Sequence, residues 1–572
     1  MKSKESATKE CCWLFLCENA IIGVAKTTDL YSAIGGIRMK LSFIGADHQV
    51  TGSCHYLEVG TKKILVDCGM EQGNNPYENA PLPVPYGEID YVLLTHAHID
   101  HAGKLPWLAA RGFHGRIIAT YATVDLCRIM LIDSAHIQEM EAEWKNRKAR
   151  RAGREQVEPL YTIADATQVL TQFEGVAYGQ MFSLCEGVQI RFTDVGHLLG
   201  SASIEVWATE GEITKKIVFS GDIGNKNKPL IRDPQYIDSA DYVVMETTYG
   251  ARNHFGKEDN HAAQLAKVID ETLSRGGNVV IPAFAVGRTQ ELLYFIRKIK
   301  AEGLTHLCGD FPVYVDSPLA VEATHVFKRN MTDCYDEETK ALVEQGINPI
   351  DFPGLRLSVT SEESKNINFD TTPKVIISAA GMCDAGRIRH HLKHNLWRPE
   401  FSVVFAGYQA EGTVGRLLVD GAQAVKLFGE EIDVRAKIVQ IDGISGHADR
   451  DGLLTWLFSF KERPQYVFTV HGNEENCTAF TTYLTQEMGY QAKAPYSGSV
   501  FDLVTGTWLV EAEPKLIDKE TAARRKATGV YTKLVEAGQE LMEVIRKNQG
   551  GANRDLQMFM EQIQALCEKW GR

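Results

Sequence analysis

The alternation of apolar and polar positions predicts a β-rich region that begins near Met39. Short apolar or alternating runs, bounded by glycine, asparagine and proline, predict strands at KLSFIGA, SCHYLEV, KKILVDCG and IDYVLLTH. LPWLAARGF then predicts a helix, and residues 126–151 predict a longer one, because Glu141 and Glu143 each stand four residues before a cation. Strand-like runs return at VQIRFTDVG, SASIEVWAT and KKIVFSGD.

From about Tyr242 the pattern changes to alternating strands and helices. The runs YVVMET, NVVIPAF, FPVYVDSP, KVIISAAG and SVVFAGYQ are almost continuously apolar, as in parallel strands covered on both faces. Helical segments such as 289–300 separate them. After about Val434, AKIVQIDG and QYVFTVHG return to the β-rich pattern of the region that begins near Met39. We therefore predict a β-rich domain in two parts, 39–240 and 434–510, with an α/β domain, 241–433, inserted between them.

The two ends of the chain differ from this body. Residues 1–38 contain the apolar run CCWLFLC, which is too short to span a bilayer and whose flanking Glu10 and Glu18 argue against a signal peptide. We interpret 1–38 as a disordered leader or as sequence upstream of a natural start at Met39. In 511–572, apolar residues recur at helical spacing before and after Gly550–Gly551: Tyr531, Leu534, Leu541 and Ile545, then Leu556, Phe559, Met560, Ile563, Leu566 and Trp570. This spacing predicts a helical extension that packs on the body or on a second copy, as in a homodimer.

Size and composition limit the compartment and the partners. A chain of 572 residues is too long for one ordinary core, so we expect more than one domain. The formal net charge of −13 argues against a general polyanion binder but is compatible with a local basic cleft. The twelve cysteines show no C-x-x-C spacing, which favours a reducing environment. We therefore expect a cytoplasmic protein that does not engage a membrane.

The segment LLTHAHIDHAG, 93–103, concentrates candidate metal ligands. His96 and His98 are two residues apart in a predicted strand, so they project to the same side. Asp100 and His101 follow at the turn into the next helix. Such a block offers two pairs of ligands to two neighbouring ions, and zinc binds both imidazole nitrogen and carboxylate oxygen. The alternative is a polar turn whose histidines are satisfied by hydrogen bonds.

Three more candidate ligands stand at predicted strand ends. His197 ends IRFTDVGH, Asp222 ends IVFSGD, and His471 ends YVFTVH. Taken singly, each is more readily a core or capping residue. Taken together with the 93–103 block, they predict a metal site where loops meet a rigid scaffold.

These motifs carry a resemblance to a known family. T-H-x-H-x-D-H-x-G at 95–103, with LVDCG before it and VGH and SGD after it, resembles the metallo-β-lactamase superfamily. Glu246 in VMETTYG, His447 in ISGHAD and His471 in TVHGN are similar to elements of its β-CASP branch, which carries an α/β insertion. DSAHIQEMEAEWKNRKARR, AFAVGRTQE and SAAGMCDAGRIRHHLKH resemble bacterial ribonucleases related to the cleavage subunit of the mRNA 3′-end processing complex. The resemblance covers roughly 39–503.

The resemblance implies an αββα sandwich with an inserted parallel-sheet α/β domain, a helical tail and a site for two zinc ions. The implied ligands are His96, His98 and His197 for one zinc, Asp100, His101 and His471 for the other, and Asp222 as the bridge. Asp67, at the end of KKILVD, would orient ligands or the bridging water.

A proton donor is also expected, because the ribose oxygen that leaves needs a proton. His447 is our candidate for this general acid, with Glu246 holding it protonated. The alternatives are a structural loop histidine at 447 and, at 246, a helix N-terminal carboxylate or a surface ion pair.

The sequence also suggests residues that bind the substrate. The backbone amides of SAAGMCDAGR around Gly381 could bind a phosphate at a strand-to-helix turn, with Ser378 and Arg288 contributing. The basic run 145–154 could follow the RNA or form a solvated helix face. We expect a second histidine cluster to line the cleft or to contact a phosphate: His390, His391 and His394.

Together these features predict a zinc-dependent ribonuclease that hydrolyses single-stranded RNA, by endonucleolytic or exonucleolytic cleavage, in RNA processing or decay. A DNA nuclease of the repair type is the first alternative, although the resemblance implies an apolar residue there in place of His471. A thioester-type hydrolase has no need of an insertion or of Glu246 and His447. A non-catalytic scaffold would have lost ligands, and here every ligand position is filled.

Overall fold

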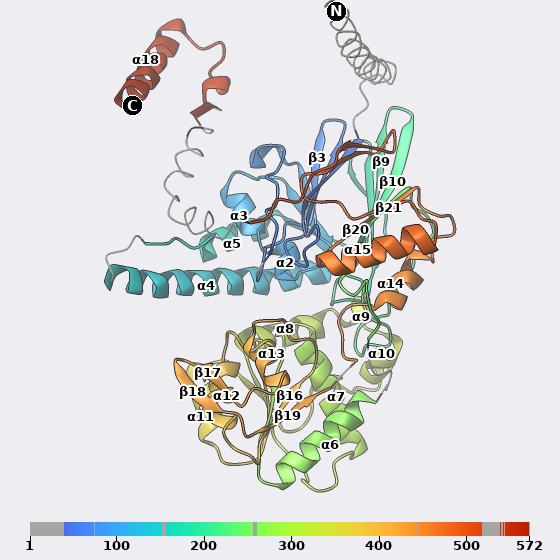
Figure 1. Cartoon of the computed structure of the whole chain (residues 1–572), viewed down its shortest axis with the longest axis vertical. Coiled ribbons are helices and arrows are strands. Elements are labelled where there is room, and N and C mark those ends of the chain that lie inside the picture. The colour runs from blue at the N-terminus through green and yellow to red at the C-terminus, as the bar shows by residue number, and fades with distance from the viewer. Residues whose placement is uncertain are drawn as a thin grey trace, which may run out of the picture. The chain divides into compact units, whose positions relative to one another are not determined.

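The structure is a computed structural model in which two β-sheets stack face to face and a third sheet lies beside them (Figure 1). It describes residues 39–73, 75–151, 156–254, 260–441, 443–517, 538, 541–542 and 544–570. The predicted leader, 1–38, lies outside these residues, as do Tyr531 and Leu534 of the predicted extension. The chain divides into two units, one of residues up to Asn75 with Asn79–Pro514 and one of Pro76–Glu78 with Lys515–Arg572.

The first stacked sheet is formed by six strands from residues 39–176 and by two strands from residues 500–510. Its order within the described chain is β23-β22-β1-β2-β3-β4-β5-β6. The strands are β1 (Met39–Gly45), β2 (Cys54–Val59), β3 (Lys62–Val66), β4 (Tyr91–Leu93), β5 (Arg116–Thr120), β6 (Phe173–Val176), β22 (Val500–Asp502) and β23 (Thr507–Val510). From β3 to β6 the pairing is parallel, so these strands end at the same edge.

The second stacked sheet has the order β21-β20-β11-β10-β9-β8-β7 among the described residues. The strands are β7 (Phe182–Cys185), β8 (Val188–Asp194), β9 (Ala202–Glu210), β10 (Ile213–Phe219), β11 (Tyr242–Glu246), β20 (Tyr466–Val470) and β21 (Ala492–Lys493). The sequence pattern assigned β11 to the inserted region, and this was wrong. Its apolar run is buried between two parallel neighbours, β10 and β20, of the second sheet.

Apolar side chains from both sheets fill the space between them, and helices cover the outer faces. Helices α3 (Leu105–Ala110), α4 (Tyr121–Arg151) and α5 (Ile163–Val169) cover the first sheet, and α14 (Arg450–Leu457) and α15 (Glu474–Thr482) cover the second (Figure 1). The αββα sandwich is thus confirmed. Helix α4 begins at Tyr121, five residues before the predicted start, because the Thr120 hydroxyl accepts from the Thr123 amide and closes its first turn.

The inserted region forms a third, parallel sheet with the order β14-β13-β15-β12-β16-β19 in the described chain. Its strands are β12 (Val279–Pro282), β13 (Val313–Asp316), β14 (Leu355–Ser358), β15 (Val375–Ser378), β16 (Ser402–Phe405) and β19 (Lys437–Gln440). Its helices include α6 (His261–Ser274), α7 (Arg288–Glu302), α8 (Pro318–Arg329), α11 (Ser361–Phe369) and α12 (Ile388–Asn395). Strand β19 was predicted to lie in the sandwich, but it pairs with β16.

The second unit contains α18 (Asn553–Trp570), on which the predicted apolar residues Leu556, Phe559, Met560, Ile563 and Leu566 fall at helical spacing. The homodimer stays a prediction. Nowhere in the described ranges is a helix both long enough and apolar enough to cross a bilayer. The cytoplasmic location also stays a prediction.

An aromatic cluster joins the two stacked sheets, and its centre is the buried Phe468 of β20. Its ring centroid lies 5.1 Å from that of Phe43, 4.9 Å from that of Phe501 and 5.6 Å from that of Trp508.

We expect Phe468→Ala to lower the free energy of unfolding by about 3–5 kcal/mol, because it leaves a cavity between the sheets. Phe369→Ala is the control, since that ring is 75% exposed, and its effect should stay within about 0.5 kcal/mol. Denaturant unfolding followed by tryptophan fluorescence measures both. Equal effects would contradict a core role for the cluster.

Candidate metal centre

The 93–103 block lies where β4 ends and α2 (Ile99–Ala102) begins, and the backbone of residues 67–70 holds it in place. The amides of Cys68 and Met70 donate to carbonyls inside the block, 2.8 and 2.9 Å away. A Cβ on Gly69 would stand 1.6 Å from the carbonyl oxygen of Asp100. Only glycine therefore allows the two segments to pack this closely.

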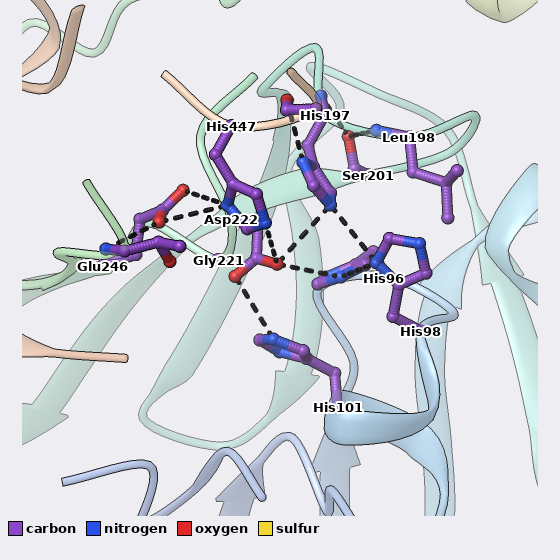
Figure 2. Close-up of polar contacts among 12 residues, drawn as sticks. His96, His98, His101, His197, Leu198, Ser201, Gly221, Asp222, Glu246 and His447 are labelled. Atoms are coloured by element: carbon purple, nitrogen blue, oxygen red, sulfur yellow. Dashed lines mark hydrogen bonds and ion pairs between the residues drawn. The ribbon is translucent and has the colours of Figure 1, made fainter. Parts of the chain in front are cut away.

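One set of candidate ligands gathers His96, His98 and His197 around one carboxylate oxygen (Figure 2). Nε2 of His96 and Nε2 of His197 lie 3.1 and 3.2 Å from Nδ1 of His98. Both Nε2 atoms lie within 3.5 Å of Oδ2 of Asp222. A tetrahedral zinc site has donors separated by about 3.3 Å, given zinc–nitrogen bonds of about 2.0–2.1 Å. The four donors therefore fit zinc.

A second set faces the other oxygen of the same carboxylate. Nε2 of His101 lies 3.1 Å from Nε2 of His471 and 3.2 Å from Oδ1 of Asp222. Asp100 completes this set, with Oδ2 3.6 Å from Nε2 of His471. Oδ1 of Asp222 is buried and accepts no hydrogen bond among the described residues. A buried carboxylate oxygen whose neighbours are imidazole nitrogens at 3.2 and 3.5 Å is what a cation would satisfy.

The protonation of most of these groups matches a ligand role. His101 is the exception: burial opposes a charge on it, but Asp222 and then Asp67 outweigh burial and raise its pKa well above the usual value. Burial and the neighbouring His96 lower the pKa of His98 to about 3. Burial and His447 lower the pKa of His197 well below its usual value. Burial opposes the charge of Asp222, but the surrounding histidines outweigh it and lower the pKa of this carboxyl. Neutral imidazoles and ionised carboxylates are the forms that bind zinc.

Asp67 lies behind the centre rather than in it. Its Oδ2 accepts from Nδ1 of His101 at 2.7 Å, and its Oδ1 accepts from the amide of Thr95 at 2.8 Å. The first bond fixes the ring of His101 so that Nε2 remains for a metal. The backbone of Asp67 has a φ of 62°, in the left-handed region. A residue other than glycine is strained there and keeps this conformation when its contacts hold it in place.

His447 and Glu246 form a pair at the edge of the centre (Figure 2). Nδ1 of His447 lies 3.1 and 3.2 Å from the two carboxylate oxygens of Glu246, and Nε2 lies 3.9 Å from Oδ2 of Asp222. Burial opposes a charge on His447, but Glu246 and then Asp222 outweigh it and raise its pKa to about 9. Glu246 ends β11 and is 1% exposed, so it is neither a surface ion pair nor a helix terminus.

The turn that was predicted to bind a phosphate, residues 378–387, makes most of its hydrogen bonds within the fold. The Ser378 hydroxyl is buried and donates to the carbonyl of Asp316, and the amides of Ala380 and Cys383 donate within their own turn. Helix α12 begins at Ile388, directly after this segment, as the predicted strand-to-helix turn requires. The carbonyl of Gly381 accepts from Gln409. The Ser378 hydroxyl and the two amides thus have partners within the fold, and roles for Ser378 and Gly381 in substrate binding stay predictions.

The second histidine cluster does not line a cleft as a group. His391 is fully buried, with Nε2 2.6 Å from Oδ2 of Asp316 and Nδ1 2.9 Å from Oδ1 of Asn368. The expectation was therefore wrong for His391, because helical spacing does not reveal which side of α12 faces the sheet. His390 stacks on Phe428, with 4.4 Å between ring centroids.

Two residues that contact the centre carried no signal in the sequence. The Thr248 hydroxyl lies 3.1 Å from Nδ1 of His471, and Nζ of Lys228 donates to the carbonyl of His197 at 2.7 Å. Of these two, only Thr248 has a position, just after the strand-terminal Glu246, that could have suggested a role. Arg288, which the sequence did suggest as a phosphate contact, donates to the carbonyl of Ile444 at 2.7 Å and pairs with Glu291, and its role in binding stays a prediction.

A cleft lies beside His447, between the sandwich and the inserted region. The loop after β11 forms one wall, and the segments after β16 and β19 form the other. It encloses about 700 Å³, including the solvent at its mouth, and is lined by Tyr249, Arg252, Asn253, His254, Gly407, Tyr408, Arg416, Gln440, Ile441, Gly443, Ile444 and Ser445. Aromatic and cationic side chains thus stand next to the predicted proton donor.

Family models match three parts of the chain. Residues 49–152 match the metallo-beta-lactamase superfamily, 289–418 match the Beta-Casp domain, and 431–495 match the Zn-dependent metallo-hydrolase RNA specificity domain. The last match contains both His447 and His471.

Three relatives match most of the chain. Ribonuclease TTHA0252 of Thermus thermophilus is 37% identical over 442 residues, which cover 77% of this chain and 95% of that protein. Transcription termination factor FttA of Methanosarcina mazei is 29% identical, covering 80% of this chain and 70% of that protein. An RNase J-like protein of Methanocaldococcus jannaschii is 28% identical, covering 81% of this chain and 99% of that protein. With this identity, these domain matches and this fold, the chain belongs to the β-CASP branch of the metallo-β-lactamase superfamily.

Proposed function

We propose that this protein is a ribonuclease that uses two zinc ions to hydrolyse phosphodiester bonds in single-stranded RNA. The observation that carries the proposal is the carboxylate of Asp222, whose two oxygens face two separate donor sets. Two relatives of the chain are named ribonuclease and RNase J-like protein, and these names support RNA as the substrate class. Seven residues would hold the two ions: His96, His98, Asp100, His101, His197, Asp222 and His471.

The residues of the chain divide the chemistry between them. When bound, zinc supplies Lewis acidity, which makes a nucleophile available from water near neutral pH and neutralises charge on the phosphate. Asp67 keeps His101 oriented through Nδ1. His447 carries a proton on Nε2, directed toward the centre, and delivers it to the ribose oxygen that leaves. Glu246 holds His447 in this orientation and favours its protonated form.

The cleft beside His447 supports a single-stranded substrate. Tyr408 is 50% exposed, and the guanidinium of the exposed Arg252 lies 5.4 Å from the ring centroid of Tyr249. Base stacking on aromatic rings contributes about 1–3 kcal/mol per base and requires bases that are not paired in a duplex. Arg252 and Arg416 supply positive charge for phosphates, although the chain as a whole is acidic.

The competing functions explain less of this arrangement. The RNA specificity domain match and the histidine at 471 favour RNA over a DNA nuclease of the repair type. A thioester hydrolase has no use for a proton donor paired with Glu246 beside a cleft of tyrosines and arginines. A scaffold without activity has no reason to keep seven ligands together.

Asp222→Ala should reduce the zinc content from two ions to at most one per chain and slow RNA cleavage by at least about 10³-fold, since both ions lose a ligand. Elemental analysis of the purified variant and a cleavage assay measure the two effects. Asp270→Ala is the control, because that carboxylate is also buried but accepts from the backbone amides of residues 306–308, which are not part of the metal centre. Two retained zinc ions in Asp222→Ala would contradict the bridging role.

Glu246→Gln should move the alkaline limb of the kcat–pH profile to lower pH while the zinc content stays unchanged. The carboxylate stabilises protonated His447, so its loss lowers the pKa of this residue from about 9 toward the usual value of about 6.5. The acid form then disappears at lower pH, and activity declines there. Single-turnover rates between pH 6 and 10 test this shift. An unmoved alkaline limb would show that Glu246 does not act through His447.

Tyr408→Ala should raise the KM for single-stranded RNA about 5–100-fold, in line with the loss of one stacked base, and change kcat little. Tyr408→Phe keeps the ring and should stay near wild type. Matched RNA and DNA strands should be compared with both variants. Preferential DNA cleavage by the wild type would overturn the assignment to RNA.

A further inference from the structure

Three charged side chains form a buried cluster where the inserted region meets the sandwich. Lys228 lies in the loop after β10, and Arg288 and Glu291 lie in the first turn of α7. Nζ of Lys228 lies 3.3 Å from Oε1 of Glu291, and Arg288 pairs with Oε2 of the same carboxylate. The three side chains are only 8–11% exposed. One carboxylate therefore holds two cations, one from each side of the interface.

Each cation also reaches a backbone carbonyl of a loop in the metal centre. Lys228 donates to the carbonyl of His197 at 2.7 Å, and Arg288 donates to the carbonyl of Ile444 at 2.7 Å. His197 is a candidate metal ligand, and Ile444 lies three residues before His447. Charged donors make stronger hydrogen bonds to carbonyls than neutral donors, so these contacts fix the two loops firmly.

The loop that carries His197 and the loop that carries His447 also contact each other directly. Nδ1 of His197 donates to the carbonyl of Gly446 at 3.1 Å, and this bond leaves Nε2 for a metal. A Cβ on Gly446 would stand 3.3 Å from Cε1 of the same ring. On the other side, a Cβ on Gly287, which precedes α7, would stand 3.1 Å from the side chain of Leu198. The start of α7 is thus packed against the loop that carries His197.

A buried ion cluster is by itself weak evidence for stability, because desolvation of the charges offsets much of their attraction. This cluster differs from an ordinary ion cluster in the backbone carbonyls that its two cations bind. Both cations need Glu291 to remain buried, and both hold a loop of the centre. Removal of the carboxylate leaves two buried cations without a counter-ion, and both loops lose a fixed donor.

We propose that Glu291 is a positioning residue that couples the inserted region to the metal ligand His197 and to the proton donor His447. The proposal rests on the proposed function for its kinetic consequence, but its structural consequence is independent of activity. Within the described chain, the ion pairs of the Glu291 carboxylate are with Lys228 and Arg288, neither of which is a candidate metal ligand. Glu291 acts through Lys228 and Arg288.

The chain offers a matched control in Glu205 of β9. This carboxylate is also buried and holds one arginine and one lysine, Arg191 at 2.7 Å and Lys216 at 2.7 Å. It accepts in addition from the Thr193 hydroxyl. None of these partners belongs to the metal centre. Glu205→Gln therefore makes the same chemical change in a buried cluster that holds no loop of the centre.

The first measurement is kinetic and uses the full-length, zinc-loaded protein. We expect Glu291→Gln to lower kcat for RNA about 10–100-fold, as the loss of groups that orient metal ligands does, with KM and zinc content near wild type. Glu291→Asp should recover part of the rate. Both Glu291→Gln and Glu205→Gln should lower the melting temperature, but Glu205→Gln should leave kcat unchanged. An equal fall of kcat in Glu291→Gln and Glu205→Gln would overturn the proposal, as would a raised KM with unchanged kcat.

The second measurement is hydrogen exchange of the metal-free protein, followed by mass spectrometry. Peptides that cover 196–200 and 443–448 should exchange at least about tenfold faster in Glu291→Gln than in wild type or Glu205→Gln. Unchanged exchange would overturn the proposal. If Glu291→Gln does not fold, Lys228→Met removes one arm and should loosen 196–200 more than 443–448. The hydrogen-exchange measurement remains decisive even if the wild type does not cleave RNA. In that case the proposed function fails, and the positioning role of Glu291 is judged by exchange alone.

Discussion

The structure depends on one buried carboxylate, that of Asp222, between two groups of imidazoles. Its side chain is 2% exposed, and Oδ1 accepts no hydrogen bond within the described chain. An ionised carboxylate in such a place is costly unless positive charge compensates it. The fold therefore assembles at its centre a set of groups that a divalent cation would stabilise, which couples metal binding to folding.

The topology explains why the inserted region overlies this centre. Asp222, Glu246 and His471 follow or end β10, β11 and β20, three adjacent parallel strands that end at the same edge. The insertion leaves the sandwich after β11 and returns before β20, so its path begins beside Glu246. The segment that leads back into the sandwich carries His447. The proposed proton donor and one wall of the cleft thus come from the segments that join the sandwich to the inserted region.

The sequence predicts the parts of the fold and site that depend on local order. A polar residue directly after an apolar run stands at a strand end, and this rule placed His96, Asp222 and His471. It does not say which sheet a strand joins, so β11 and β19 were assigned to the wrong sheets, since apolar runs in both sheets look alike. Helical spacing likewise did not separate the buried His391 from its neighbours. The cluster around Glu291 depends on contacts between residues 63 positions apart, which no local pattern encodes.

The difference between His447 and the ligand candidates His98 and His197 follows from their neighbours, since all three are buried. His98 and His197 are surrounded mainly by other imidazoles, so burial and repulsion lower their pKa values and leave their lone pairs available to a metal. His447 lies against the same carboxylate, Asp222, yet its Nδ1 is held by both oxygens of Glu246, and its pKa is raised to about 9. Despite burial, Asp222 and Asp67 also raise the pKa of His101, so a raised pKa favours an acid role for His447 only together with its place outside the two donor sets. Although Asp222, Glu246 and His447 could by distance form a third metal site, their charges favour a proton donor there instead. Environments that push the pKa values of like residues apart are what acid and ligand roles in one site require.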